Sequence, residues 1–200
     1  MKVRYITIER EYGSGGTKIA ALTAEKCGVS CYGREILERA AEKLYLPVGV
    51  LNGYEESVSG SFIYSMFVMS QSQTADPDLL SPEAKLFVEE TRIIRELAAG
   101  GPAIFVGHCA SHALKDREGV IRVFIRADEE SRHERILHDY NIPEREINAV
   151  SRKFDRKRAN YYAFCTQKKW SDPDNYDIVL DSSRLGIEGC ADVLAALMQK

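Results

Sequence analysis

The sequence contains no apolar run long enough to span a membrane, and Lys2 and Arg4 are not followed by the apolar core of a signal peptide. It also lacks a Cys-x-x-Cys pair, and its 5 cysteines are an odd, widely spaced set. Cys27 and Cys31 have no second pair of ligands nearby, which argues against zinc. These absences predict a cytoplasmic protein with reduced thiols and no membrane partner.

A strong excess of charge is also missing, because 27 Lys and Arg are opposed by 30 Asp and Glu, for a net charge of −3. Without an overall basic field, we expect no nucleic-acid partner. The basic residues that do occur gather locally, over residues 145–169. At 200 residues and 44% hydrophobic content, the chain is long enough for one α/β domain with a sizeable core.

Short apolar runs alternate with amphipathic segments along most of the chain. The runs that we interpret as strands are residues 3–8, 29–32, 103–106, 120–125 and 176–180. The segments that we interpret as helices are residues 17–27, 34–46, 81–99, 128–140, 143–169 and 186–198. This alternation predicts a parallel sheet flanked by helices. Residues 47–81 contain the turn signals Asn52-Gly53, Ser59-Gly60 and Asp76-Pro77, so we expect helical pieces outside the sheet there.

A glycine-rich turn follows the first predicted strand, with the sequence Glu9-Arg10-Glu11-Tyr12-Gly13-Ser14-Gly15-Gly16-Thr17. A strand, a glycine turn and a helix in this order form a phosphate cradle. Glycines let the backbone bring successive N–H groups close to an anion, and the helix N-terminus adds partial positive charge. The turn therefore predicts a site for a nucleotide triphosphate.

The turn departs from the P-loop pattern G-x-x-x-x-G-K-[ST] at two positions. Gly15 matches the second glycine, and Thr17 matches the hydroxyl that would hold Mg²⁺. Arg10 stands where the first glycine is expected and Gly16 where the lysine is expected, which leaves Lys18 and Arg10 as the nearest cations. The alternative is a tight strand–helix turn that holds no ligand.

Two further groups of side chains are candidates for phosphate contacts. In the basic segment, Arg152 and Asp155 fall near one helix face, with Arg158 close to Asp155, and an aspartate among arginines can orient their guanidinium groups. The alternative is a solvated basic helix. Arg34 and Arg39 begin the second predicted helix and His108 follows the third strand, where surface or structural roles are equally open.

Four short motifs follow one another along the chain. They are Ile8-Glu9-Arg10-Glu11-Tyr12-Gly13-Ser14-Gly15-Gly16, Gly107-His108-Cys109-Ala110, Asp155-Arg156-Lys157-Arg158-Ala159-Asn160-Tyr161-Tyr162 and Asp181-Ser182-Ser183-Arg184-Leu185-Gly186. In this order the chain resembles the cytidylate-kinase-like group of P-loop kinases, over essentially its whole length. The Glu-Tyr-Gly-Ser-Gly-Gly start looks like that group's own version of the P-loop.

The resemblance implies one kinase domain of the nucleoside-monophosphate-kinase fold. The implied core is residues 1–33, 100–142 and 173–200, with an inserted helical acceptor-binding lobe at 34–99 and a basic lid at 143–172. ATP and Mg²⁺ are the implied cofactors. The residues implied for the donor triphosphate are Gly13, Ser14, Gly15, Gly16, Thr17 and Lys18, with Thr17 near the metal. Those implied for the acceptor are Arg34, Arg39 and His108, and those for catalysis in the lid are Arg152, Asp155 and Arg158.

Two departures bear on the acceptor. Related cytidylate kinases tend to carry an acidic residue where this chain has Gly33, and an arginine where it has His108. We therefore expect phosphoryl transfer from ATP to a nucleoside monophosphate, with small-molecule nucleotides as partners, and leave two alternatives open. One is a nucleotide-binding or sensor protein with impaired catalysis, and the other is a kinase for another small acceptor. The sequence indicates no oligomeric state.

Overall fold

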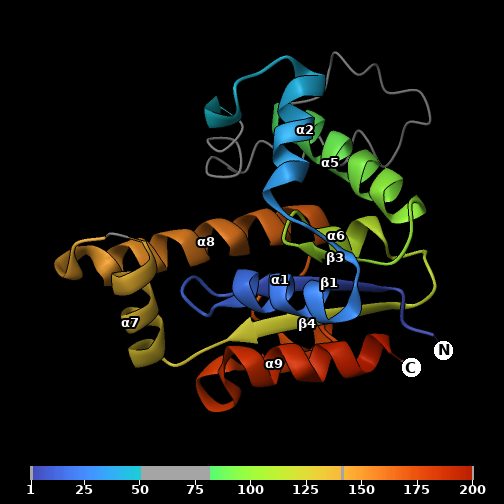
Figure 1. Cartoon of the computed structure of the whole chain (residues 1–200). Helices are drawn as coiled ribbons and strands as arrows, with labels where there is room; N and C mark the ends of the chain where they lie inside the picture. The colour runs from blue at the N-terminus through green and yellow to red at the C-terminus, as the bar shows by residue number, and fades with distance from the viewer. Residues whose placement is uncertain (1, 51–81, 141, 200) are drawn as a thin grey trace.

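The computed structural model describes residues 2–50, 82–140 and 142–199. Over these residues a five-stranded parallel sheet forms the centre of the molecule, in the order β2-β3-β1-β4-β5 (Figure 1). The strands are β1 (Tyr5–Arg10), β2 (Ser30–Tyr32), β3 (Ala103–Val106), β4 (Val120–Arg126) and β5 (Ile178–Asp181). In β1, Ile8 is paired with Val106 on one side and Val123 on the other. The predicted parallel sheet is confirmed.

Helices connect the strands. Those described are α1 (Gly16–Cys27), α2 (Arg34–Leu44), α5 (Pro82–Ala99), α6 (Ala110–Ala113), α7 (Glu129–Asp139), α8 (Ile147–Thr166) and α9 (Ser182–Met198), with short 3₁₀ turns at Glu144–Glu146 and Pro173–Asn175. Local signals set their ends. Asp128 accepts a 2.8 Å hydrogen bond from the Ser131 N–H at the start of α7, and Gly28 ends α1 in the left-handed conformation. The predicted turn signals at residues 52–53, 59–60 and 76–77 lie outside the described residues.

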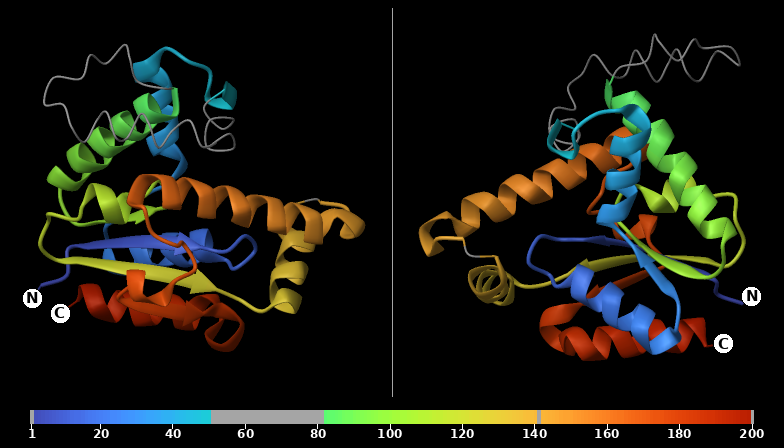
Figure 2. Two further views of the ribbon diagram at one scale, coloured as in Figure 1. Left: turned by 180° about the vertical axis from the view of Figure 1, so that it is seen from behind. Right: turned by 45° about the horizontal axis from the view of Figure 1, so that its top comes forward.

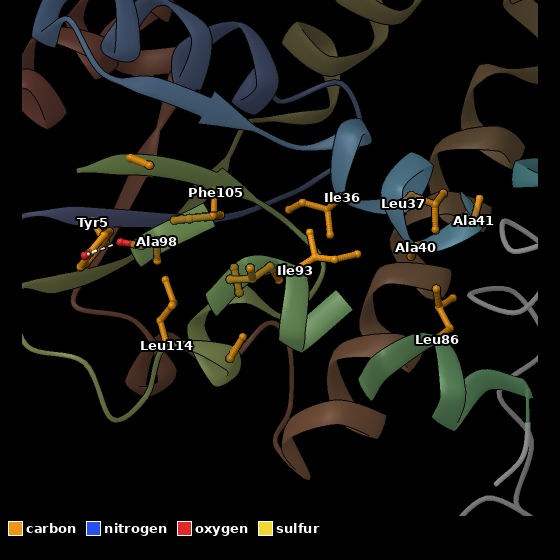
Figure 3. Close-up of a cluster of buried hydrophobic side chains, with 14 residues drawn as sticks. Tyr5, Ile36, Leu37, Ala40, Ala41, Leu86, Ile93, Ala98, Phe105 and Leu114 are labelled. Carbon is orange, nitrogen blue, oxygen red and sulfur yellow. Dashed lines mark hydrogen bonds between the residues drawn. The ribbon is translucent and has the colours of Figure 1, made fainter. Parts of the chain in front are cut away.

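Helices cover both faces of the sheet, and the two halves of the core follow from the alternation of side chains along β1. Ile6 and Ile8 are buried against α1 and α9 on one face. Tyr5 points to the other face, where α5, α6 and α8 lie (Figure 2). There its hydroxyl donates a 2.8 Å hydrogen bond to the carbonyl oxygen of Ala98, inside a cluster that joins α2 to α5 (Figure 3).

Strand β1 lies at the point where the chain changes direction across the sheet. After β1, strands β2 and β3 are added on one side of it and β4 and β5 on the other. In such sheets the ligand crevice opens at the carboxyl ends of the strands beside this point. Residues that follow β1 and β5 meet there, because the Ser182 hydroxyl donates a 2.6 Å hydrogen bond to the carbonyl of Ser14.

Candidate active site

The glycine turn after β1 is built as an anion cradle. Gly13 and Gly15 both have φ +78°, a left-handed conformation that favours glycine. Gly15 is the N-cap of α1, and its carbonyl accepts the 2.9 Å hydrogen bond from Ile19 that begins the helix. The N–H groups of Gly16, Thr17 and Lys18 belong to the first turn, so they have no acceptor within α1 and are available to an anion.

Neighbouring elements hold the carbonyl oxygens of this turn. Arg132 Nε donates to the carbonyl of Tyr12 at 2.7 Å, and Arg135 Nη1 donates to that of Gly13 at 3.3 Å. Both arginines are on α7, while Ser182 of α9 holds the next carbonyl. Three successive peptide groups are therefore fixed from outside, which stabilises the strained turn.

The side chain of Arg10 occupies the space beside two glycines. A Cβ built on Gly16 would lie 2.6 Å from Arg10 Cβ, and one built on Gly107 would lie 2.3 Å from Arg10 Nη1. Both distances are too short for atoms that are not bonded. Arg10 therefore extends from the start of α1 toward the residues after β3, and neither position tolerates a side chain while it is there.

A second arginine reaches the same place from α8. Arg158 Nη1 donates a 2.8 Å hydrogen bond to the carbonyl of Arg10, and its guanidinium lies 5.6 Å from the ring centre of Tyr12. Burial and the nearby positive charge of Arg10 lower the pKa of Arg158 to about 9. It keeps its charge at neutral pH, so two guanidinium groups share a site that an anion would stabilise.

Two hollows meet at these arginines. A cavity of about 430 Å³ lies on the side of Glu9, His108 and Tyr161, and a crevice of about 30 Å³ lies beside the glycine turn and Thr17. Arg10 and Arg158 line both. Arg34 and Lys157 add further positive charge to the lining of the larger cavity. The basic residues are thus placed between a candidate donor site and a candidate acceptor site.

Glu9 lines the larger cavity, and the buried Glu90 lies behind its wall, where it contacts the lining residues His108 and Tyr161. Glu9 Oε2 accepts a 3.1 Å hydrogen bond from the indole of Trp170, and burial raises the pKa of Glu9. Glu90 is fully buried, lies 2.7 Å from Nδ1 of His108, and accepts a hydrogen bond from the Tyr161 hydroxyl. The cavity is therefore polar on one side and cationic on the other.

Helix α8 is held against the glycine turn by Asp155. Its Oδ1 accepts a 2.7 Å hydrogen bond from the N–H of Tyr12, and its Oδ2 pairs with Arg132 of α7. The ring of Phe154 stacks on that of Tyr12 with centroids 4.6 Å apart. Asp155 does orient a guanidinium as expected, but that of Arg132 and not one from its own helix.

The structure separates some residues that the sequence grouped together. Arg152 is exposed on the outer side of α8 with Arg156 and Asn160 and lines neither hollow, so the structure does not bring it together with Arg158. Arg39 is exposed on α2 and lines neither hollow, whereas Arg34 lines the cavity.

Lys18 and Thr17 both line the crevice beside the glycine turn. The Lys18 ammonium already forms an exposed 2.7 Å ion pair with Asp139. Among the described residues, no group of three or more His, Cys, Asp or Glu is arranged to hold a metal ion. A magnesium site here would depend on the Thr17 hydroxyl and on oxygens of bound phosphates, which suits Mg²⁺ because it keeps few protein ligands.

The contacts of Arg132 and Arg135 with the turn are not evident from the amino-acid sequence. Both lie in a highly charged helix in which Ile136 is the buried residue, four positions after Arg132 and next to Arg135. Ile136 indicates the inward face, but one apolar position is a weak periodic signal. The role of Glu9 is not evident from sequence for a different reason. No local pattern shows that a carboxyl group in a strand is buried.

A parallel sheet with a glycine turn at the reversal point and a cationic helix over it defines a P-loop kinase fold. Structures of this fold resemble it over nearly full length. An uncharacterised protein from Eubacterium ventriosum matches with TM-score 0.73 and 21% identity, covering 100% of this chain and 99% of that chain. Shikimate kinase from Bacteroides thetaiotaomicron matches with TM-score 0.55 and 14% identity, covering 98% of both chains. TT1252 from Thermus thermophilus matches with TM-score 0.52 and 18% identity, covering 98% of both.

A family model for the cytidylate kinase-like family matches residues 5–184, and the chain belongs to this family. None of the curated proteins matches it. Family and fold together support a nucleotide-dependent kinase, which is a phosphotransferase. No helix of the described residues has the length and apolar character needed to cross a membrane.

Proposed function

We propose that the protein transfers the γ-phosphoryl group of ATP to a small phosphate-bearing acceptor of the nucleoside-monophosphate class. One observation carries this proposal. Arg10 and Arg158 line both the crevice at the glycine turn and the larger cavity, so the same two cations face a donor and an acceptor. Phosphoryl transfer needs positive charge at this junction, because charge spreads over the transferred group.

The donor triphosphate would bind along the turn from Gly13 to Lys18, with N–H groups of the first turn of α1 directed at its oxygens. Mg²⁺, when bound beside Thr17, would neutralise charge on the phosphates. The crevice of about 30 Å³ is narrow and Arg158 of α8 lines it, so we expect α8 to shift from the turn when a triphosphate binds. The contacts of Asp155 with Tyr12 and Arg132 are the ones that this movement would break.

The acceptor would bind in the larger cavity. Its volume of about 430 Å³ is in the range for small-molecule sites. Arg34 and Lys157 would attract the acceptor phosphate, and the polar side chains Glu9 and His108 would contact the remainder. A phosphate oxygen attacks as an anion and needs no general base, so positioning and charge neutralisation account for the chemistry.

The test is ADP release from ATP–Mg²⁺ with cytidine, deoxycytidine, uridine and adenosine monophosphates, with shikimate as an acceptor that offers a hydroxyl group. We expect release with at least one monophosphate and none above background with shikimate. Release with shikimate alone would replace the proposed acceptor class with a hydroxyl-bearing one. Calorimetric ATP binding without any release would instead favour a nucleotide sensor with impaired catalysis.

A further inference from the structure

The P-loop lysine is missing from this chain, and the structure shows what stands in its space. Gly16 occupies the lysine position, and its missing side chain leaves the room that Cβ and Cγ of Arg10 use, at 2.6 and 2.8 Å from a built Cβ. Arg10 occupies the position of the first glycine of the usual pattern. An arginine at 10 and a lysine at 16 therefore exclude each other, while the usual pair of glycine and lysine avoids the conflict.

The guanidinium of Arg10 lies between the candidate donor site and the candidate acceptor site. It passes beside Gly107, whose built Cβ would lie 2.3 Å from Nη1, and it lines both hollows. Among the described residues, its buried Nε has no hydrogen-bond partner. No acceptor of these residues therefore holds Nε, and a phosphate oxygen in either hollow would be contacted by the Nη groups of the same guanidinium.

The other nearby cations are less suited to this role. The exposed ammonium of Lys18 is compensated by Asp139 at 2.7 Å. Arg158 belongs to α8, so its position depends on the lid, whereas Arg10 is fixed at the end of the central strand.

We infer that Arg10 is a catalytic residue that replaces the P-loop lysine on the donor phosphates, and that Gly16 and Gly107 accommodate it. This inference rests on the proposed function, since it assigns a residue to the phosphoryl transfer. If Arg10 replaces the lysine, a glycine at position 10 should require a lysine at position 16. A swap of the residues at these two positions can test this.

The first comparison is Arg10→Met, which keeps much of the side-chain volume and removes the charge. We expect kcat to fall about 100-fold or more, the scale of losing one group that stabilises a transferring phosphoryl. Arg156→Met is the matched control, because Arg156 lies on the outer side of α8. It should stay within about threefold of the unmodified protein, so an Arg10→Met variant that matches it would overturn the inference.

The second comparison is the swap, made from Arg10→Gly, Gly16→Lys and the double variant that contains both. Arg10→Gly removes the proposed substitute for the lysine and leaves Arg158 and the paired Lys18 beside the turn. Gly16→Lys forces lysine into the space of Arg10, so both variants should be poor. The double variant restores the usual arrangement, and we expect its kcat to recover to within about tenfold of the unmodified protein. A double variant that melts like the unmodified protein but is no better than either single change would contradict the inference.

Affinity for ATP separates this inference from the proposed function. If the unmodified protein releases no ADP with any acceptor, the proposed acceptor chemistry fails, but calorimetry still compares ATP binding between Arg10→Met and Arg156→Met. A selective loss of ATP affinity of tenfold or more in Arg10→Met would then support Arg10 as the phosphate contact. Equal affinities would reject it.

Discussion

Arg158 Nη1 donates a 2.8 Å hydrogen bond to the carbonyl oxygen of Arg10, and this contact joins the basic helix α8 to the end of the central strand. It also brings two guanidinium groups together, and burial with this repulsion lowers the pKa of Arg158. The carboxylates of Asp155 and Glu9 offset part of this repulsion, and an anion bound beside both guanidinium groups would offset more of it. The arrangement therefore offers a phosphate group a cationic site at the junction of α8 and β1.

The first prediction concerns the two sides of α8. Arg158→Ala should lower kcat by about 10³-fold with a smaller change in ATP affinity, because an arginine of the proposed lid would stabilise the transferring group preferentially. Arg152→Ala should behave like Arg156→Ala, with kcat within a few-fold of the unmodified protein, because both side chains lie on the outer side. Steady-state rates and calorimetric ATP titrations check this. A large loss in Arg152→Ala would restore the grouping expected from sequence.

A second prediction compares the two glycines at the ends of α1. Gly15 (φ +78°) and Gly28 (φ +64°) are both left-handed, so alanine should cost about 1 kcal/mol of stability at either. Only Gly15 lies in the cradle, and its Cβ would also displace Ile187, which is 2.3 Å away, whereas Gly28 has nothing within 4 Å. Gly15→Ala should therefore weaken ATP binding at least tenfold, and Gly28→Ala should leave it unchanged. Equal ATP affinities in the two folded variants would reject the cradle.

The order of strands and helices is predictable from the sequence because their periodicities are long and glycine and proline mark their ends. The boundaries differ where a side chain starts a helix early. A short helical turn begins at Ser182, where the Asp181 carboxylate accepts a 3.1 Å hydrogen bond from the Ser183 N–H, and the main part of α9 follows Gly186, close to the predicted start. Gly186 (φ 70°, ψ 175°) interrupts that helix as a kink. Such capping contacts add residues ahead of a boundary drawn from hydrophobicity.

The site is only partly predictable, since local sequence does not say which face of α8 meets the turn. Spacings of three residues connect Arg152, Asp155 and Arg158, yet the face drifts around the helix over that length. The burial of Tyr161 and Cys165, which the structure shows, identifies the inward face of α8. Arg158 lies three and seven residues before them, on that face. The hydrogen bonds that join Arg132 and Arg135 to the turn depend on tertiary packing that no local pattern contains.

The third prediction is a pH dependence caused by Glu9. Burial raises its pKa above 4.5 despite the opposing charges of Arg10, Arg158 and His108, so the folded protein binds its proton more tightly than the unfolded chain. The contribution of Glu9 to stability is then full below pH 4.5 and is lost as the pH rises through the higher folded pKa. Glu9→Gln keeps an acceptor for the Trp170 indole and removes this loss.

We therefore expect the melting temperature of Glu9→Gln to exceed that of the unmodified protein at pH 8, by an amount that shrinks toward pH 4.5. Unfolding curves over pH 4–8 measure this difference. Glu134→Gln is the control, because Glu134 is exposed on α7. This substitution also removes one carboxyl group, but one that is not buried. A difference that stays constant with pH, or that reverses sign, would show that Glu9 is not protonated preferentially in the folded state.

The last prediction concerns the acceptor. His108 lies in the cavity with Nδ1 at 2.7 Å from the buried Glu90, and a histidine ring cannot clamp an anion with two parallel hydrogen bonds as an arginine does. We expect weak, poorly selective activity toward cytidine monophosphate, and a kcat/KM about tenfold higher in His108→Arg, where Glu90 can orient the new guanidinium. His133→Arg is the matched control, because Nε2 of His133 also lies near a carboxylate, 3.9 Å from Oε1 of Glu144, but on the surface. The measurement is kcat/KM for cytidine, deoxycytidine, uridine and adenosine monophosphates in all three proteins. Strong, selective cytidine monophosphate activity in the unmodified protein would show that other residues of the cavity already recognise this acceptor, and that His108 is not what limits it.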